Sequence, residues 1–198
     1  MKEKGLVIWD TEDEKQHKQD SFRFLSRHNW SSDESIKSKR ESDPVEEIDL
    51  TGKYFFLSNC TDSPIIFNGI MYQSTEAAYQ SIKTKSIKIK YQLSQVDDVS
   101  EAYCIGRNLI PFYGWKRKRL SSMRDIVKLK FDTYPNAKEK LMLTYPKKIV
   151  ARNNWGDTYW GIYNNKGNNF LGKILMNIRR KYIYEKELEE FWESDTSL

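Results

Sequence analysis

Residues 115–133 read WKRKRLSSMRDIVKLKFDT, and the apolar side chains of this stretch recur at the spacing of one helix face. That spacing predicts an amphipathic helix whose other face carries many Lys and Arg side chains. Residues 171–191 repeat the same period, which predicts a final helix with an apolar stripe against the core. Two long amphipathic helices favour a domain built mainly from helices.

Strand-like segments are short and come before the helices. Residues 53–57 (KYFFL) predict a strand, and residues 65–72 predict a hairpin. The hairpin should turn at Asn68-Gly69, because this dipeptide suits tight two-residue turns. After the hairpin, Ser74 is suited to cap a long helix over residues 75–93, which would place Glu76 in its first turn.

Shorter helices are predicted over residues 97–110 and 136–144, and residues 149–170 are predicted to be mainly loop. Helices outnumber strands, so the predicted fold is α+β and mainly α-helical. It is a single compact domain with a small β-sheet or hairpin near its N-terminus.

Composition divides the chain into three parts. Residues 1–48 are polar, mixed in charge and contain one Gly and one Pro, which predicts a poorly ordered extension. Residues 185–198 carry one Lys and six acidic residues, which predicts an acidic C-terminal tail. Residues 49–184 form the predicted domain, whose length is ordinary for a single domain.

The predicted domain is strongly basic. Residues 51–184 hold 23 Lys and Arg against 9 Asp and Glu, a net charge of +14. Such a charge attracts a phosphorylated metabolite, a dinucleotide or nucleic acid, although a solvated basic surface is the alternative.

The residue types that the predicted domain lacks exclude several kinds of catalysis and metal binding. Both histidines, His17 and His28, lie in the N-terminal segment, so neither Ser-His-Asp catalysis nor a histidine-bound metal is expected in the domain. Cys60 and Cys104 lack C-x-x-C spacing, which indicates no zinc site and a reducing compartment. Acid–base work would fall to carboxylates, lysines or tyrosines. Residues 51–184 hold only nine carboxylates: Asp62, Glu76, Asp97, Asp98, Glu101, Asp125, Asp132, Glu139 and Asp157.

Hydropathy places the protein away from membranes. No run of about 18 apolar residues occurs, and the apolar stretch near the start is too short for a signal peptide. An intracellular, cytoplasmic protein with no membrane partner is therefore expected.

Two features have both a structural and a functional interpretation. In the loop over residues 153–161, Trp155, Tyr159 and Trp160 surround Asp157, which suits either a ligand platform or a plug for the core. An acid in the position of Glu76 usually serves the helix dipole, whereas a catalytic role needs it beside a developing positive charge.

An ordered set of motifs extends over residues 54–180 and resembles the YbiA-like, or NADAR, superfamily. The motifs are Phe56-Leu57-Ser58-Asn59, Pro64-Ile65, Gly69, Ser74-Thr75-Glu76, Tyr79-Gln80-Ser81-Ile82-Lys83, Gly106-Arg107, Trp115, Lys130-Phe131, Leu143-Thr144, Asp157-Thr-Tyr-Trp160-Gly161 and Gly167-x-Asn169-x-Leu171-Gly172-x-x-Leu175-Met176-x-x-Arg179.

Three positions depart from the family pattern. Ala77 replaces the usual histidine after the motif glutamate, and Cys60 replaces a usual phenylalanine. Ala151-Arg152 stands where many members have an acid. These changes bear on substrate choice more than on the fold.

The resemblance implies a compact, largely helical enzyme without metal or cofactor that hydrolyses N-glycosidic bonds of ribose phosphates or ADP-ribose. One substrate class comprises the early ribosylaminopyrimidine 5′-phosphates of riboflavin synthesis, and the other is ADP-ribose attached to guanine in DNA. The family's functional residues correspond here to Glu76, Trp115, Asp157 and Trp160.

The chemistry of glycoside cleavage assigns roles to these residues. Glu76 would orient or deprotonate water while Asp157 holds the ribose or stabilises its positive charge, and the two roles could be exchanged. Trp115 and Trp160 would stack on the base or exclude solvent. The other predicted substrate-binding residues are Asn59 and, for the phosphate, Lys83 and Arg107.

Three functional hypotheses remain open from sequence. The first is an N-glycosidase of small phosphorylated N-ribosides, acting in metabolite damage control. The second is an enzyme that removes ADP-ribose from nucleic acid or nucleotides, with the basic residues 116–119 following a phosphate backbone. The third is a non-catalytic ADP-ribose-binding module.

Overall fold

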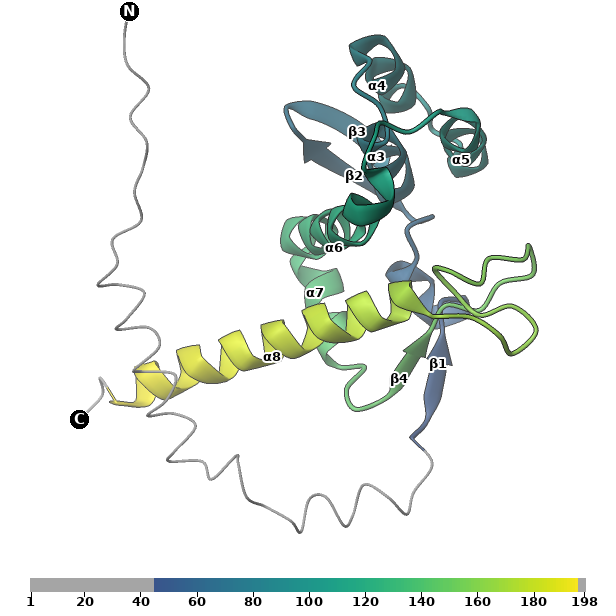
Figure 1. Cartoon of the computed structure of the whole chain (residues 1–198). Helices are drawn as coiled ribbons and strands as arrows, with labels where there is room; N and C mark the ends of the chain where they lie inside the picture. The colour runs from purple at the N-terminus through teal and green to yellow at the C-terminus, as the bar shows by residue number, and fades with distance from the viewer. Residues whose placement is uncertain (1–44, 196–198) are drawn as a thin grey trace, which may run out of the picture. The chain divides into compact units, whose positions relative to one another are not determined.

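The computed structural model describes residues 45–195, and residues 1–44 and 196–198 lie outside this range. Most of the predicted extension therefore falls outside the described residues. In chain order the elements are β1 (Glu47–Asp49), a 3₁₀ helix η1 (Gly52–Leu57), β2 (Asp62–Phe67), β3 (Ile70–Ser74), α3 (Thr75–Ile82), α4 (Ile87–Ser94), α5 (Val99–Asn108), α6 (Trp115–Thr133), α7 (Pro135–Met142), β4 (Lys148–Val150) and α8 (Phe170–Asp195) (Figure 1).

The predicted hairpin is present as β2 and β3. The strands pair antiparallel with Phe67 opposite Ile70, and both turn residues, Asn68 and Gly69, adopt positive φ values. Asn and Gly tolerate this backbone region best, which explains the turn. The antiparallel pair leads directly into α3, so the hairpin fixes where that helix starts.

A second small sheet joins segments about 100 residues apart. β1 pairs parallel with β4, with Glu47 opposite Lys148 and Asp49 opposite Val150. Figure 1 shows both strands close to the start of α8. This sheet was not predicted from the sequence because each of its strands has only three residues.

Two predicted elements were wrong. The segment KYFFL forms the 3₁₀ helix η1 rather than a strand, and Leu57 is its one fully buried residue. The predicted helix over residues 75–93 is divided into α3 and α4. Lys83 ends α3, and its carbonyl accepts a hydrogen bond from the distant Phe112 N–H (3.1 Å). Ser86 then caps α4 by accepting from the Ile89 N–H (3.4 Å).

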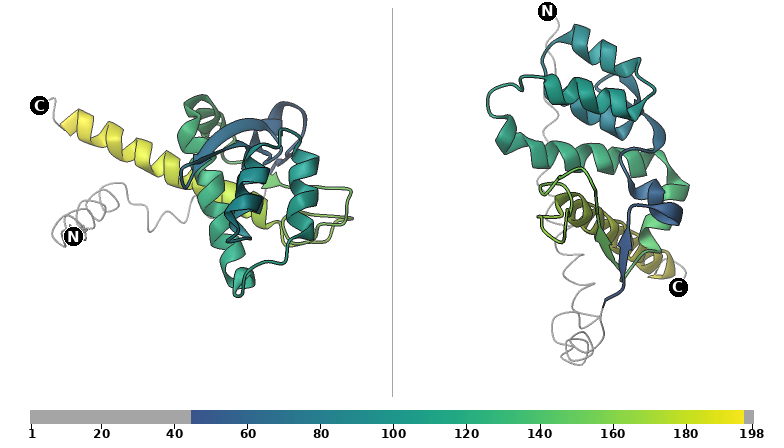
Figure 2. Two further views of the ribbon diagram at one scale, coloured as in Figure 1. Left: turned by 90° about the horizontal axis from the view of Figure 1, so that it is seen from above. Right: turned by 90° about the vertical axis from the view of Figure 1, so that its right-hand side faces the viewer.

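α6 is the central helix of the domain and has the predicted bounds, residues 115–133. Met123, Ile126, Val127 and Phe131 are buried along it. α6 packs against α3 on one side and α8 on another, an arrangement visible in the right-hand view of Figure 2. Helices therefore dominate the core, and the mainly helical α+β fold is confirmed.

α8 continues beyond the predicted domain end at residue 184. It reaches Asp195, so much of the segment predicted as an acidic tail is helical.

Among residues 45–195, every helix is too short or too polar to span a membrane.

Lys130 fastens the segment after η1 to α6. Its buried ammonium donates to the Phe56 and Ser58 carbonyls and to Thr61 Oγ1, each at 2.7 Å. An ammonium has three donors, so these acceptors satisfy the buried charge. This interaction fixes the loop that carries Asn59.

Candidate active site

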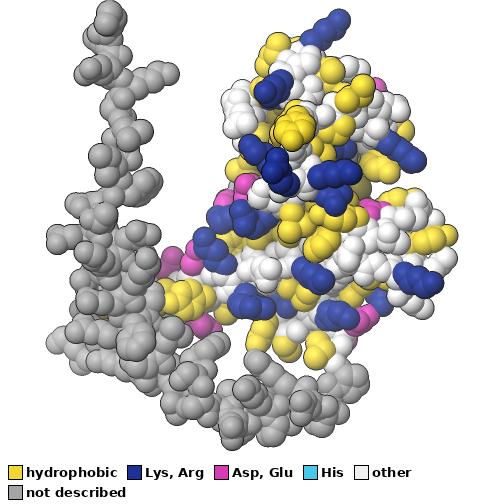
Figure 3. Space-filling view, in the orientation of Figure 1, with side chains coloured by type: hydrophobic (Ala, Val, Ile, Leu, Met, Phe, Trp, Pro, Cys, Tyr) yellow, Lys and Arg dark blue, Asp and Glu magenta, His cyan; other side chains and the backbone are white. Residues whose placement is uncertain are grey.

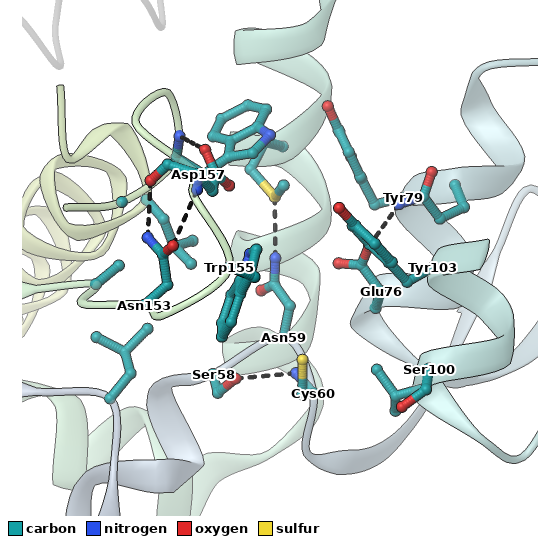
Figure 4. Close-up of a pocket in the computed structure, with 18 of the residues that line it drawn as sticks. Ser58, Asn59, Cys60, Glu76, Tyr79, Ser100, Tyr103, Asn153, Trp155 and Asp157 are labelled. Atoms are coloured by element: carbon teal, nitrogen blue, oxygen red, sulfur yellow. Dashed lines mark hydrogen bonds between the residues drawn. The ribbon is translucent and has the colours of Figure 1, made fainter. Parts of the chain in front are cut away.

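One cavity of about 1170 Å³ brings distant parts of the chain together. Its walls come from residues 50–60, α3, α5, the first half of α6 and the loop over residues 151–161 (Figure 4). All seven residues predicted from sequence for the site line it: Asn59, Glu76, Lys83, Arg107, Trp115, Asp157 and Trp160.

Glu76 lies in the first turn of α3, as predicted. Ser74 caps this helix by accepting from the Ala77 N–H (3.1 Å), and the Glu76 N–H donates to the Asn59 carbonyl (3.2 Å). The half-buried carboxylate accepts a hydrogen bond from Gln80 Nε2, one turn further along. The capped start of α3, the loop that carries Asn59 and the hydrogen bond from Gln80 together hold Glu76 in one orientation.

The surroundings of Glu76 shift the pKa of its carboxyl. Burial raises the pKa of the Glu76 carboxyl above its usual range, and the Gln80 hydrogen bond and the Lys83 charge oppose this rise. The negative charge of Asp157, which lines the same cavity, adds to the rise of the Glu76 pKa. A raised pKa makes the ionised carboxylate a stronger acceptor for a proton, as a general base requires.

Gly106 of α5 makes room for Gln80. A Cβ atom at Gly106 would lie 1.9 Å from Gln80 Oε1, closer than any side chain can approach. The Gln80 side chain can therefore occupy this position only while residue 106 lacks a Cβ atom. This contact gives a physical reason for the glycine of the Gly106-Arg107 motif.

Replacing Gln80 with methionine should move the acid limb of the pH profile of kcat/KM to higher pH. The substitution keeps the side-chain volume but removes the hydrogen bond that favours ionised Glu76. Activity that needs the carboxylate is lost as the pH falls through the Glu76 pKa, so a higher pKa brings that loss to a higher pH. The profile is measured from pH 4 to 9, with the exposed Gln92→Met on α4 as control. An acid limb that does not move in Gln80→Met would disprove the coupling.

Asp157 organises the loop over residues 151–161. Its Oδ1 accepts from the Tyr159 and Trp160 N–H groups (2.8 and 2.9 Å), and its own N–H donates to Asn153 Oδ1 (2.9 Å). Asn153 Nδ2 returns a bond to the Asp157 carbonyl (2.7 Å). Within residues 45–195, Oδ2 has no hydrogen-bond partner, so this oxygen is available to a ligand.

The two predicted tryptophans form a wall with Tyr79. Ring centroids are 5.5 Å apart for Trp115 and Tyr79, and 5.7 Å apart for Trp160 and Tyr79. Trp115 is buried and Trp160 half-buried, so most of their surface faces protein. The structure thus favours solvent exclusion over open stacking for this pair.

Three other aromatic side chains that line the cavity are exposed: Phe55, which is 46% exposed, Trp155 and Tyr103. Trp155 is 66% exposed and Tyr103 is 40% exposed, and both line the cavity. They lie on the loop over residues 151–161 and on α5 (Figure 4). Trp155 was predicted only as part of the loop, and Tyr103 was not predicted as a site residue. Its position four residues before Arg107, hence on the same helix face, was the available signal.

The cationic side chains around the cavity differ in their partners. Lys83 Nζ donates to the Gly106 carbonyl (3.1 Å), and burial lowers the pKa of this amine while the Glu76 charge raises it. Arg107 is exposed at the rim. Arg152, at the position that departs from the family pattern, forms an ion pair with Glu47 of β1.

Metal ligands are not grouped in this part of the chain. Residues 45–195 contain no cluster of three or more His, Cys, Asp or Glu side chains able to hold a metal ion. The cavity is lined by four carboxylates, Glu76, Asp97, Asp98 and Asp157, together with an aromatic wall and several cations.

A mainly helical domain whose aromatic-walled cavity is lined by Glu76 and Asp157 fits the class of glycoside-cleaving hydrolases. The particular family follows from comparison: the NADAR domain model matches residues 15–182, and the chain belongs to this family.

Known relatives agree with this assignment. N-glycosidase YbiA of Shigella flexneri serotype 5b is 30% identical over 136 residues, which cover 67% of this chain and 84% of that protein. A riboflavin biosynthesis protein of Vibrio vulnificus is 24% identical over 149 residues, covering 74% of this chain and 40% of the relative. The NMR structure of Escherichia coli YbiA matches with a TM-score of 0.65 and 26% identity, over 73% of this chain and 89% of that one. The predicted family and the predicted N-glycosidase class of enzyme are confirmed.

Proposed function

We propose that this N-glycosidase cleaves ribosylaminopyrimidine 5′-phosphate intermediates of riboflavin synthesis in the cytoplasm, as a form of metabolite damage control. The products are ribose 5-phosphate and the free base. The observation that carries the proposal is that two carboxylates from distant parts of the chain, Glu76 and Asp157, line one cavity. The names of the relatives support the choice of substrate, since they include both N-glycosidases and riboflavin biosynthesis proteins.

The proposed reaction is a hydrolysis at C1′ of the ribose. The C1′–N bond breaks as its electron pair leaves with the nitrogen, and positive charge develops on the ribose ring. Glu76 accepts a proton from water as the water oxygen bonds to C1′, and that proton replaces the ribose on the departing nitrogen. Asp157 Oδ2 stabilises the ring charge or holds a ribose hydroxyl.

Incubation with the ribosylaminopyrimidine 5′-phosphate tests the proposal directly. We expect release of ribose 5-phosphate, measured by a coupled enzymatic assay, at a rate well above spontaneous hydrolysis. No release from the folded protein would overturn this choice of substrate.

Removal of ADP-ribose from guanine in DNA or from nucleotides is the second candidate, and the size of the cavity favours it. Small-molecule sites usually occupy roughly 300–1,000 Å³, whereas this cavity measures about 1170 Å³. Figure 3 also shows many Lys and Arg side chains and few acidic ones on the visible face. Cleavage of ADP-ribosylated guanine, together with DNA binding that weakens steeply with salt, would favour this function. A lack of DNA binding at low salt would count against nucleic acid as the partner.

A further inference from the structure

Arg119 is a cation of the cavity that the sequence analysis did not single out. It lies one helical turn after Trp115 on α6 and lines the same cavity as Glu76 and Asp157. Its basic neighbours, residues 116–118, are exposed and do not line the cavity, whereas Arg119 is half-buried. The structure thus separates Arg119 from the basic cluster in which the sequence placed it.

Tyr159 fixes the guanidinium of Arg119. The central carbon of the guanidinium lies 3.5 Å from the centroid of the Tyr159 ring. That ring in turn packs against Trp160 at 4.8 Å and Phe170 at 4.7 Å between centroids. Stacking covers a face of the planar guanidinium and leaves its N–H edges for hydrogen bonds.

The hydrogen-bonding capacity of Arg119 is unused in this part of the chain. Among residues 45–195 it has neither an ion pair nor a hydrogen bond, and its buried Nε has no partner. A buried charged donor without an acceptor is unfavourable. A preorganised cation of this kind is therefore suited to an anion that enters with the ligand.

The other cations of the cavity are engaged or solvated. Lys83 donates to the Gly106 carbonyl, and Arg152 is paired with Glu47. Arg107 is exposed and has no aromatic stacking partner among the described residues. Arg119 alone among these four combines a fixed orientation with free donors.

We propose that Arg119 binds a phosphate group of the substrate. Two N–H groups on one guanidinium edge match two phosphate oxygens, a geometry that lysine does not provide. The proposal rests on the proposed function in one respect, namely that the substrate is phosphorylated. Both candidate substrates supply this group, as a 5′-phosphate monoester or as the diphosphate of ADP-ribose.

Direct binding measurements test this role without requiring turnover. The dissociation constants of ribose 5-phosphate and ADP-ribose are measured by calorimetry for the wild type, Arg119→Met and Arg119→Lys. We expect Arg119→Met to weaken binding by about 10- to 100-fold, and Arg119→Lys by less, because a charge-assisted bidentate contact is lost. Arg124→Met is the matched control, since Arg124 lies on the same helix, is exposed and pairs with Asp125. Its affinities should equal those of the wild type.

The choice of ligand distinguishes the two phosphate sources. Weaker binding of ribose 5-phosphate would place Arg119 at a phosphate monoester, and a loss confined to ADP-ribose would place it at the diphosphate. Wild-type affinity for both ligands in Arg119→Met, or no binding of either by the wild type, would overturn the inference.

Turnover separates a failure of this inference from a failure of the proposed function. If the wild type cleaves the N-riboside, Arg119→Met should lower kcat/KM for the phosphorylated substrate and leave that for the unphosphorylated one unchanged. An equal loss on both would indicate a structural role and overturn the inference. If the wild type cleaves neither substrate but Arg119→Met still loses phosphate affinity, the proposed function fails and the inference stands.

Discussion

Glu76→Gln is expected to lower kcat by about 10²–10⁴-fold, the usual contribution of a positioned general base. Glutamine keeps the size of the side chain and an oxygen that can accept from Gln80 Nε2, but it cannot take a proton from water. The fold should be retained, because the helix cap at Ser74 and the Glu76 N–H bond to Asn59 do not involve the carboxylate. The measurement is kcat under saturating substrate, together with a thermal unfolding curve.

Glu101→Gln provides the matched control for this change. Glu101 lies in the first turn of α5, just as Glu76 lies in the first turn of α3. Unlike Glu76, Glu101 is exposed and does not line the cavity. We expect wild-type kcat for this variant. Wild-type kcat in a folded Glu76→Gln protein would remove Glu76 from the chemistry and leave it as a helix-dipole residue.

The residues that line the site could be predicted from sequence more completely than the contacts that define their roles. The order of short motifs selected Glu76 and Asp157, and both line the cavity. Motif order cannot say which oxygen of Asp157 is engaged with the loop, since that depends on the fold of residues 153–160. It also could not separate Arg119 from the neighbouring cations, because burial depends on which face of α6 meets Tyr159.

The fold was predictable where a segment determines its own structure. α6 has a long apolar period, and Asn68-Gly69 suits its turn, so both were found. The wrong or missing predictions concern segments whose structure depends on contacts with residues far away in the sequence. The end of α3 depends on Phe112, which bonds to the Lys83 carbonyl, and β1 forms only because β4 lies beside it. Local sequence does not contain those partners.

Asp157→Asn and Asp157→Ala should have different effects, and the difference separates the two roles of this residue. Asparagine can still accept from the Tyr159 and Trp160 N–H groups through its amide oxygen, so the loop is kept while the charge is lost. We expect kcat to fall about 10²–10³-fold with little change in Tm, because an electrostatic stabiliser of the transition state is removed. Alanine removes the charge and both loop hydrogen bonds, and should also lower stability by about 1–3 kcal/mol.

The pair of variants is decisive because Asp157 connects the chemistry to the loop. Loss of its Oδ1 contacts would release Tyr159, on which Arg119 stacks, and Trp160, which forms the wall with Tyr79. Asp157→Ala should therefore raise KM as well as lower kcat, whereas Asp157→Asn should act mainly on kcat. If Asp157→Asn retained wild-type kcat and only Asp157→Ala were impaired, Asp157 would be a loop residue alone. Charge stabilisation would then have to come from another carboxylate that lines the cavity, of which Glu76 is the one held in the first turn of α3.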